Sequence, residues 1–546
     1  MIGYAFERLG KALRSWAEVT PPPSDVRFDR DVEIPMRDGV ILRANVFRPE
    51  GDARVPIILS AHPYGKDALP RRSLFGYRAP MMYRIMRQPS RTQISAWTSW
   101  EAPDPAFWVS QGYAVVNLDL RGFFRSDGTG CVMSREQGRD VHDAIEWLAV
   151  QPWCTGRVGM CGVSYLAITQ WLAAAERPPH LAAICPWEGL TDAYRDLAYP
   201  GGVREDGFVP FWSKQVNAEP RNRDDLRAEQ LARPLIDDWW RDRASALEQI
   251  DVPLLVCGSF SDHNLHTNGS FDGFARVRSQ HKWLYTHRDG KWVAFYGAEA
   301  RAFQARFFAC FLKDEDNGMR DVPPIRLEVR DTGDAVAEIR GEREWPLART
   351  QWTSLYLHAD GTLGEKPAAA AAEISYDCAR GTATFRWKVE RDLELTGPMM
   401  LRLHVEARGV DDLLLFAGVR KSRAGRELTF EGSFGFGRDL VTRGWLRASH
   451  RTLDPHRSTP YRPVHAHDRV DKLSSGEIVP VDLALLPSAT TFRANDIVQL
   501  DIQGRYFFRR NPLVGQFPTG YEASTAGTAV LHIGGRYDAH LSVPIV

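Results

Sequence analysis

The stretch RVGMCGVSYLAITQWLAAAE, residues 157–176, decides the fold. An apolar run leads into the tetrapeptide GVSY, residues 162–165, and a helix-forming segment follows at once. A strand that turns this sharply into a helix exposes the residue at the turn, and the small Gly162 admits the tight backbone. The pattern predicts that Ser164 is a nucleophile. The backbone N–H of Tyr165 and the positive end of the helix would then stabilise a developing oxyanion.

The motif departs from the pattern Gly-x-Ser-x-Gly that is typical of such turns. Leu166 stands two residues after the serine, and Ala167 follows it. A Gly-x-Ser between a strand and a helix is also found in ordinary tight turns. The local match therefore leaves two interpretations, and the surrounding sequence has to decide between them.

Short apolar runs alternate with helical patterns from Val32 to about Leu190, which is typical of a parallel sheet built from βαβ units. The runs that we expect to be strands are 55–62, 113–120, 157–164, 181–187, 252–260 and 282–287. One helical face is predicted from apolar residues at i, i+3, i+4 and i+7, namely Val141, Ala144, Ile145 and Leu148. The sequence therefore predicts an α/β domain.

Two of the later strands are followed by residues that could activate Ser164. Asp262 comes at the end of the run VPLLVCGSFSD, and His287 comes at the end of the run KWLYTH. A serine needs a base, and the base needs an orienting carboxylate. The order Ser, acid, His, each from a loop after a strand, is that of the α/β-hydrolase fold. We therefore predict that Ser164, Asp262 and His287 form a catalytic triad, with His263 and His266 as the competing candidates for the base.

A second oxyanion donor should come from the loop after an early strand, and SAHPYGKD (60–67) occupies that place. The loop has no HGGG run, so a side chain is expected to donate. The hydroxyl of Tyr64 can do so, with His62 as the alternative.

The predicted organisation is a catalytic domain, an inserted helical cap and a β-rich domain. A chain of 546 residues exceeds what one hydrophobic core usually supports. Helix-like stretches without strands indicate the cap, and alternation with period 2 after Pro323 indicates a β-sandwich of jelly-roll type. The expected segments are an N-terminal helical arm at 1–24, the α/β-hydrolase domain at 25–190 and 251–322, the cap at 191–250, and the β-sandwich at 323–546.

Composition restricts the partners. Lys plus Arg and Asp plus Glu each total 69, which gives no broad electrostatic reason to expect nucleic acid or an anionic membrane. Seven scattered cysteines without a CxxC pair indicate reduced thiols, and neither a zinc site nor a cofactor is expected. No stretch approaches the roughly 20 apolar residues of a membrane span. We expect a cytoplasmic protein that acts on a small-molecule ester, amide or short peptide. A homo-oligomer is left open.

The sequence resembles the cocaine-esterase-like (CocE/NonD) hydrolases, which are grouped with the X-prolyl dipeptidyl peptidases of family S15 and the α-amino acid ester hydrolases. The resemblance rests on MRDGVILRANVFRP, the PYGK loop, LDLRGFFRSDG, GVSYLAITQW, the GSFSDH loop and the C-terminal β-domain. It implies a hydrolase domain, a helical cap and a jelly-roll domain. It also implies the triad Ser164, Asp262 and His287, with Tyr64 and the Tyr165 N–H as the oxyanion hole.

The resemblance leaves the substrate open. We expect a shaping role for the loop that holds Asp119, Arg121, Gly122, Ser126 and Asp127. The candidate substrate pocket consists of Trp187, Glu188, Phe211 and Trp212. Binding of a free amine would need carboxylates such as Glu188, Glu205 and Asp206. The leading hypothesis is a carboxylic-ester hydrolase. The alternatives are an X-prolyl dipeptidyl peptidase or α-amino acid ester hydrolase, an acyltransferase that uses the same triad, and a non-catalytic binding protein on this fold.

Overall fold

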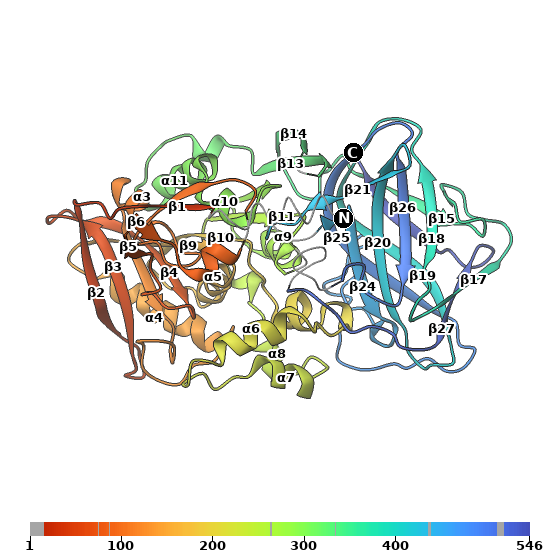
Figure 1. Ribbon diagram of the computed structural model, residues 1–546, viewed down its shortest axis with the longest axis horizontal. Coiled ribbons are helices and arrows are strands. Elements are labelled where there is room, and N and C mark those ends of the chain that lie inside the picture. The colour runs from red at the N-terminus through yellow and green to blue at the C-terminus, as the bar shows by residue number, and fades with distance from the viewer. Residues whose placement is uncertain are drawn as a thin grey trace.

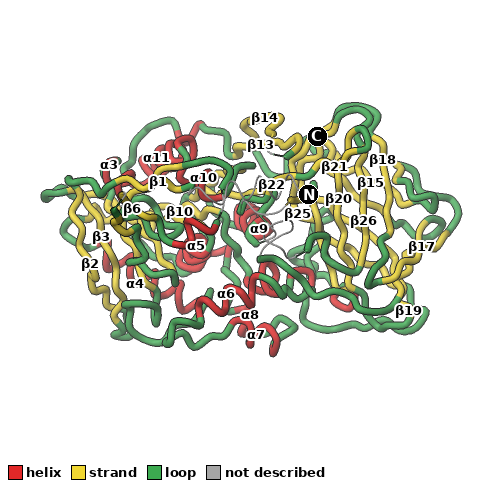
Figure 2. The backbone as a smooth tube through the Cα atoms, viewed as in Figure 1, coloured by secondary structure: helices red, strands yellow, loops and turns green. Residues whose placement is uncertain are grey.

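The computed structural model describes residues 16–546 except 75, 87, 263–264, 334, 435–437 and 510–517. Figure 1 shows two halves side by side, with helices and strands mixed in the first half and strands dominating the second. Figure 2 shows the same division by secondary structure. No helix among the described residues is both long and apolar enough to span a bilayer.

A mostly parallel sheet forms the centre of the first half. Its strand order is β2–β3–β8–β4–β9–β10–β11–β12–β13–β14, with parallel pairing from β8 to β13 and antiparallel pairing at both edges. The strands span Val26–Pro35, Ile41–Pro49, Ala114–Asp119, Val55–His62, Cys154–Val163, Leu181–Trp187, Leu254–Ser259, Lys282–His287, Ile325–Thr332 and Ala335–Glu342. The carboxyl ends of the parallel strands therefore meet at one edge, where α/β folds carry their sites.

Helices pack on this sheet with their apolar faces buried. The face predicted from Val141 to Leu148 lies in α4, where all four of its apolar residues are buried. The helices of this half are α2 Met81–Ile85, α3 Pro105–Ser110, α4 Arg135–Ala149, α5 Tyr165–Ala175, α9 Thr267–Arg276, α10 Lys291–Tyr296 and α11 Ala298–Leu312. Together they form one hydrophobic core with the sheet.

Residues 191–250 fold as short helices along one side of both halves (Figure 1). They comprise η1 Ala193–Ala198, η2 Pro200–Gly202, α6 Phe208–Val216, α7 Leu226–Ala232, α8 Asp238–Arg241 and η3 Leu247–Gln249. Several begin at an aspartate whose carboxylate accepts backbone N–H groups, as Asp225 does at α7. This segment joins β10 to β11 and lies next to their carboxyl ends.

The second half is a β-sandwich with its own core. One sheet centres on β19, which pairs with β25, β27 and β28, while the other follows the order β18–β26–β20–β24. The main strands are β15 Gln351–Leu357, β17 Ala372–Asp377, β18 Ala383–Lys388, β19 Leu393–Arg408, β20 Leu414–Arg423, β24 Thr442–Arg447, β25 Val479–Phe492, β26 Ile497–Gln503, β27 Thr528–Ile533 and β28 His540–Ile545. The apolar residues of alternating positions fill the space between the sheets.

Two segments differ from the sequence prediction. Residues 1–15, most of the expected helical arm, lie outside the described residues, and Ala17–Thr20 form strand β1 in parallel pairing with β7, Thr92–Ser95. Strand β13, expected to open the β-sandwich, extends the catalytic sheet and also pairs with β25, so it connects the two halves. Its apolar side chains belong to the catalytic core.

Candidate active site

Ser164 lies at a strained turn between β9 and α5. Its backbone has φ 59° and ψ −113°, a conformation that residues other than glycine rarely adopt. Gly162 makes the turn sterically possible, because a Cβ there would lie 2.5 Å from the Cβ of Leu166. Stored strain of this kind is characteristic of a nucleophile elbow.

Leu166 stands where the pattern Gly-x-Ser-x-Gly has its last glycine. Its side chain is completely buried and occupies the space that Gly162 leaves open. Ala167, the next residue, packs against Gly189 just after β10, where a Cβ would lie only 2.5 Å from the Cβ of Ala167. The two glycines therefore make room for the larger residues that follow Ser164.

Among the described histidines, His266 contacts the serine. His263, the other competing candidate for the base, lies outside the described residues. Its Nε2 lies 3.1 Å from Ser164 Oγ, and its Nδ1 lies 2.6 Å from Asp262 Oδ2. Asp262 follows β11, and the chain then turns so that His266 lies directly before α9, four residues further on. Both side chains are almost completely buried. The three groups have the connectivity of a nucleophile, a base and an orienting acid.

The sequence prediction placed the base at His287, and this is a correction. His287 does end β12 as expected, but its Nε2 lies 2.7 Å from Glu188 Oε1 and its Nδ1 lies 3.1 Å from the carbonyl oxygen of Asp289. Both ring nitrogens are therefore engaged away from Ser164. The negative charge of Glu188 outweighs the effect of burial and raises the pKa of His287.

The sequence kept His266 as a competing candidate because it lies in the same loop as Asp262. Helix α9 begins only at Thr267, so the four-residue spacing is not a helical one and gave no signal for the pairing. The order of the strands favoured His287. That order predicts which loops lie at the carboxyl edge of the sheet, but it does not predict the orientation of each imidazole ring.

The second oxygen of Asp262 has two donors. Lys291 Nζ lies 2.8 Å from Oδ1, and Ser433 Oγ lies 3.0 Å from it. Burial disfavours the ionised carboxylate, but the charges of Lys291 and His266 outweigh that effect and hold the pKa of Asp262 below its usual range. Asp262 is therefore ionised at neutral pH, as an orienting acid must be.

The candidate oxyanion donors lie beside the nucleophile. The Tyr64 ring packs edge-on against the Tyr165 ring, with centroids 6.0 Å apart, and Trp212 of the cap stacks on Tyr165. Trp212 Nε1 donates to the Tyr64 hydroxyl at 3.2 Å, which leaves the hydroxyl proton free to donate elsewhere. Burial raises the pKa of Tyr64 well above its ordinary value, so the hydroxyl keeps its proton. His62, the alternative, is completely buried below this loop.

A further carboxyl, Glu101, lies under the nucleophile turn. Its carbonyl oxygen accepts the Val163 N–H, and its Oε1 accepts from Trp292 Nε1 at 3.1 Å. Burial raises the pKa of Glu101 to about 8, so this side chain is mostly neutral at pH 7. No sequence pattern pointed to this residue.

Comparison with known proteins shows the family of the chain. The family model described as X-Pro dipeptidyl-peptidase (S15 family) matches residues 38–290, and the one described as its C-terminal non-catalytic domain matches residues 317–542. The crystal structure of a CocE/NonD family hydrolase from Staphylococcus aureus is 38% identical, covers 95% of this chain and 94% of that chain, and has a TM-score of 0.89. The chain belongs to the CocE/NonD family of hydrolases. This membership confirms the resemblance inferred from the sequence motifs.

Two further proteins extend the comparison. The cocaine esterase of a Rhodococcus species is 30% identical over 390 residues, which is 61% of this chain and 62% of that enzyme, so the match spans less than two thirds of the relative. An α-amino acid ester hydrolase is 19% identical with a TM-score of 0.71, over 96% of this chain and 97% of that chain, and shares the fold. The α/β-hydrolase fold followed by a strand-rich, sandwich-like domain is thus confirmed.

The residues expected in the substrate pocket of this CocE/NonD chain lie in different places. Trp212 contacts Tyr64, as described, and Phe211 is a half-buried neighbour on the same helix. Trp187 is completely buried and packs against Tyr285 and Phe295 in the core. Glu188, also completely buried, has the strained φ of 48° and pairs with His287.

The loop after β8 has the shaping role expected of it. Arg121 forms ion pairs with Asp140 at 2.6 Å and Asp38 at 2.7 Å, and Ser126 Oγ donates to the carbonyl oxygen of Asp119. Gly122 is required there, because a Cβ would meet the backbone nitrogen of Gly130 at 2.1 Å. Asp127 lies at the loop surface.

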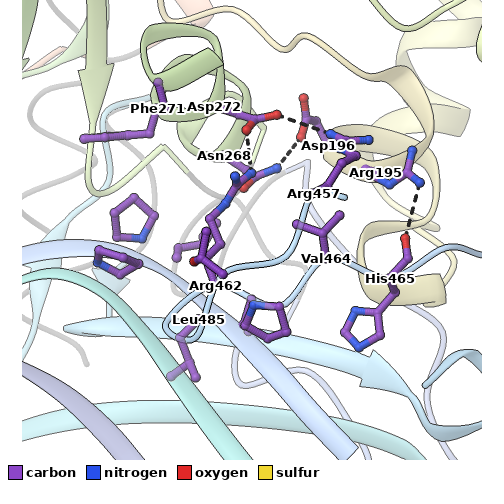
Figure 3. Close-up of a pocket in the computed structure, with 18 of the residues that line it drawn as sticks. Arg195, Asp196, Asn268, Phe271, Asp272, Arg457, Arg462, Val464, His465 and Leu485 are labelled. Atoms are coloured by element: carbon purple, nitrogen blue, oxygen red, sulfur yellow. Dashed lines mark hydrogen bonds and ion pairs between the residues drawn. The ribbon is translucent and has the colours of Figure 1, made fainter. Parts of the chain in front are cut away.

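A cavity of about 380 Å³ lies between α9, the cap and the β-sandwich (Figure 3). Arg195 and Asp196 of the cap, Asp272 of α9, and Arg457 and Arg462 of the β-sandwich line it. Asp272 Oδ1 lies 2.8 Å from Arg462 and its Oδ2 lies 3.3 Å from Arg457, so the walls are ion-paired across the two halves. The described residues that line it do not include Ser164, Asp262 or His266.

Two groups among the described residues bring possible metal ligands within 4.8 Å of one another: Glu188, Cys257 and His287, and Glu373, Glu406 and His532. In the first group the carboxylate and the imidazole already bind each other, and burial raises the pKa of the Cys257 thiol far above its ordinary value. A protonated thiol is a poor ligand. The second group is partly exposed and holds ion pairs with Arg408.

Proposed function

We propose that this protein is a carboxylic-ester hydrolase in which Ser164 is the nucleophile, His266 the general base and Asp262 the orienting acid. The observation that carries the proposal is the pair of contacts at His266, 3.1 Å from its Nε2 to Ser164 Oγ and 2.6 Å from its Nδ1 to Asp262 Oδ2. The Nδ1–H of His266 donates to the carboxylate, which leaves Nε2 to accept the serine proton.

The reaction then follows from the geometry. Ser164 Oγ attacks the ester carbonyl while its proton passes to His266 Nε2, and the tetrahedral oxyanion is held by the Tyr165 N–H and the Tyr64 hydroxyl. His266 returns the proton to the leaving alcohol, and the acyl group stays on Ser164. A water molecule then attacks the acyl-enzyme with His266 again as base, which releases the acid and restores the serine.

The carboxylates of the site favour an ester over a substrate that is recognised by its free amine. Glu188 is paired with His287 and Lys291. Glu205 accepts the backbone N–H groups of residues 207, 208, 209 and 520, and Asp206 is paired with Arg204 and Arg227. All three candidates from the sequence thus have protein partners, so an ammonium group would have to displace one of them.

A second candidate function is that of an X-prolyl dipeptidyl peptidase, which the matching family model favours. An acyltransferase would differ only in the acceptor, with an alcohol or amine in place of water. A cytoplasmic location fits the proposal, because all seven cysteines are buried free thiols and free thiols persist in reducing compartments.

The test combines covalent labelling with a substrate comparison. A fluorophosphonate is expected to label Ser164, and Ser164→Ala to lose both label and activity. Turnover of p-nitrophenyl esters is expected to exceed turnover of X-prolyl anilides. Labelling at a different serine contradicts the nucleophile, and faster anilide turnover contradicts the ester preference. Acyl transfer to added amines in preference to water would establish the acyltransferase.

A further inference from the structure

Lys291 has no role in the steps above, yet its side chain lies completely buried directly behind Asp262. It is the first residue of α10, and its backbone N–H donates to the carbonyl oxygen of Ser433 at 2.8 Å. Its ammonium group lies 4.2 Å from the centre of the Phe434 ring. Burying an ammonium group costs several kcal/mol unless other groups compensate its charge. The charged and polar groups that contact its ammonium group therefore indicate the role of Lys291.

Carboxylates and one imidazole face Lys291 from three loops. Nζ lies 2.8 Å from Asp262 Oδ1, 3.5 Å from Glu188 Oε2 and 2.8 Å from His266 Nδ1. Glu101 is the next carboxyl group near it, and it adds attraction only when it is ionised. The attraction of Asp262 and Glu188 outweighs burial and raises the pKa of Lys291, so the ammonium keeps its charge.

These contacts fix the orientation of the triad acid. Oδ1 of Asp262 receives Lys291 and Ser433, while Oδ2 receives His266 Nδ1. A carboxylate with donors on both oxygens cannot rotate without losing one of them. Oδ2 thereby stays beside His266 Nδ1, and Nε2 faces Ser164 Oγ. An Nδ1–H that donates to Oδ2 cannot also accept from Lys291, so Lys291 acts on the ring through its charge.

The same position affects the charge of the base. His266 becomes positive when it accepts a proton, and Lys291 Nζ then lies beside a second cation. Asp262 favours the imidazolium, but it shares its negative charge between the two cations. Glu188 is the other acidic group acting on His266. Its two carboxylate oxygens contact Lys291 and His287. Burial and Lys291 together lower the pKa of His266.

We propose that Lys291 is a positioning residue of the triad, which fixes the carboxylate of Asp262 and places a positive charge beside His266 Nδ1. The inference rests on the proposed function. It names a group that touches no substrate and acts only through Asp262 and His266.

The experiment measures the rate at which a fluorophosphonate labels Ser164 as a function of pH. The rate should rise with pH as His266 loses its proton. Removal of a charge at this distance shifts a pKa by about 1–3 units, so in Lys291→Met this rise should move to higher pH by that amount. Lys291→Arg keeps the charge and should leave the midpoint near that of the unaltered protein. The KM for an activated ester should be the same in all of them.

Ser433→Ala is the matched control, because it removes an uncharged donor from the same Oδ1. Its midpoint should move much less than that of Lys291→Met. An unmoved midpoint in Lys291→Met, or an equal shift in Ser433→Ala, overturns the inference while the triad stands. Absence of labelling in the unaltered protein overturns the triad and this inference with it.

Lys291→Met leaves Glu188 without one of its positive partners, and its folding is checked by the thermal unfolding midpoint. If this variant does not fold, Lys291→Gln removes the positive charge and keeps a hydrogen-bond donor for the carboxylates that face it. The same upward shift is expected from Lys291→Gln, and an unmoved midpoint in that variant again overturns the inference.

Discussion

At the scale of single residues, the site holds two carboxylate–histidine pairs of similar geometry. Asp262 pairs with His266 at 2.6 Å, and Glu188 pairs with His287 at 2.7 Å. Only His266 has its second nitrogen directed at Ser164. The identity of the base therefore depends on the direction of one ring.

This difference can be tested by replacing each histidine with glutamine. His266→Gln should lower kcat by about 10⁴-fold or more, because the nucleophile loses its base. His287→Gln keeps a donor for Glu188 and should retain most of the rate, with a loss of stability instead. Initial rates on an activated ester and thermal unfolding midpoints separate the two effects. The reverse pattern, a dead His287→Gln beside an active His266→Gln, would restore the base first predicted from the sequence.

At the scale of elements, buried strands were the easiest features to predict. The bounds expected for β4, β10 and β12 agree with the structure, because a strand covered on both faces is a continuous apolar run. Strand β13 was harder to assign for the opposite reason, since it pairs with strands of both halves. It lies near the sheet edge beside antiparallel β14, and its apolar and polar residues alternate like those of a sandwich strand.

The nucleophile turn also depends on packing between elements, at Ala167 of α5 and Gly189 after β10. Gly189→Ala should force the two methyl groups together and cost about 1–3 kcal/mol of stability, with a loss of labelling at Ser164. Adding Ala167→Gly to that variant should recover most of the loss, less about 1 kcal/mol for glycine in a helix. Denaturant unfolding of the two single variants and the double variant measures the coupling. Additive effects would show that the contact does not matter.

At the scale of the whole molecule, the two halves build the site together. Ser433 and Phe434 come from the sequence of the β-sandwich, and they contact Asp262 and Lys291. Arg330 of β13 is almost completely buried and donates to Ser261 on one side and Ser488 on the other. Contacts between residues so far apart leave no periodic signal, which is why the sequence predicted Ser164 and Asp262 but neither Lys291 nor Ser433.

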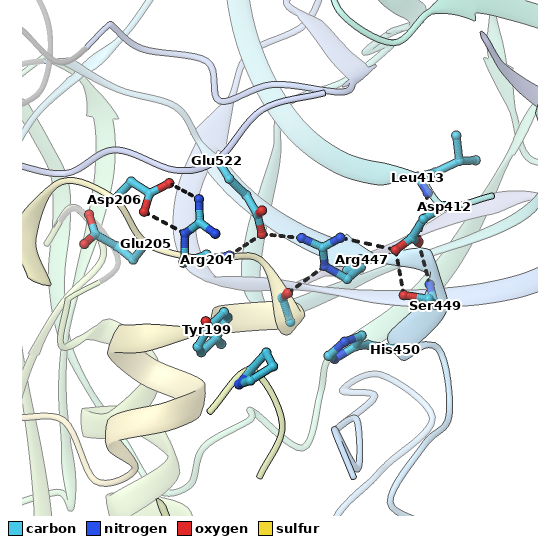
Figure 4. A network of polar contacts seen from close by, with 12 residues as sticks. Tyr199, Arg204, Glu205, Asp206, Asp412, Leu413, Arg447, Ser449, His450 and Glu522 are labelled. Carbon is cyan, nitrogen blue, oxygen red and sulfur yellow. Dashed lines mark hydrogen bonds and ion pairs between the residues drawn. The ribbon is translucent and has the colours of Figure 1, made fainter. Parts of the chain in front are cut away.

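The cap is fastened to the β-sandwich by a network around Arg447 (Figure 4). Arg447 Nε donates to the carbonyl oxygen of Gly202 at 3.1 Å, and its other nitrogens pair with Asp412 at 3.2 Å and with Glu522. Glu522 in turn accepts the backbone N–H of Arg204 at 2.7 Å. Since the cap also supplies Trp212, which contacts Tyr64, the network holds one wall of the site in place.

Arg447→Met should therefore affect both stability and substrate binding. The side chain is only 24% exposed, and its loss removes charged hydrogen bonds worth about 1–3 kcal/mol. The loosened cap should raise KM more than it lowers kcat, because Ser164 and its base lie on the other side of the interface. Arg469→Met is the control: its pair with Asp471 is exposed, and such pairs contribute about 0–1 kcal/mol. Equal unfolding midpoints for the two variants would mean that the cap is held by its apolar contacts alone, and an unchanged KM in Arg447→Met would mean that the cap does not shape the site through this network.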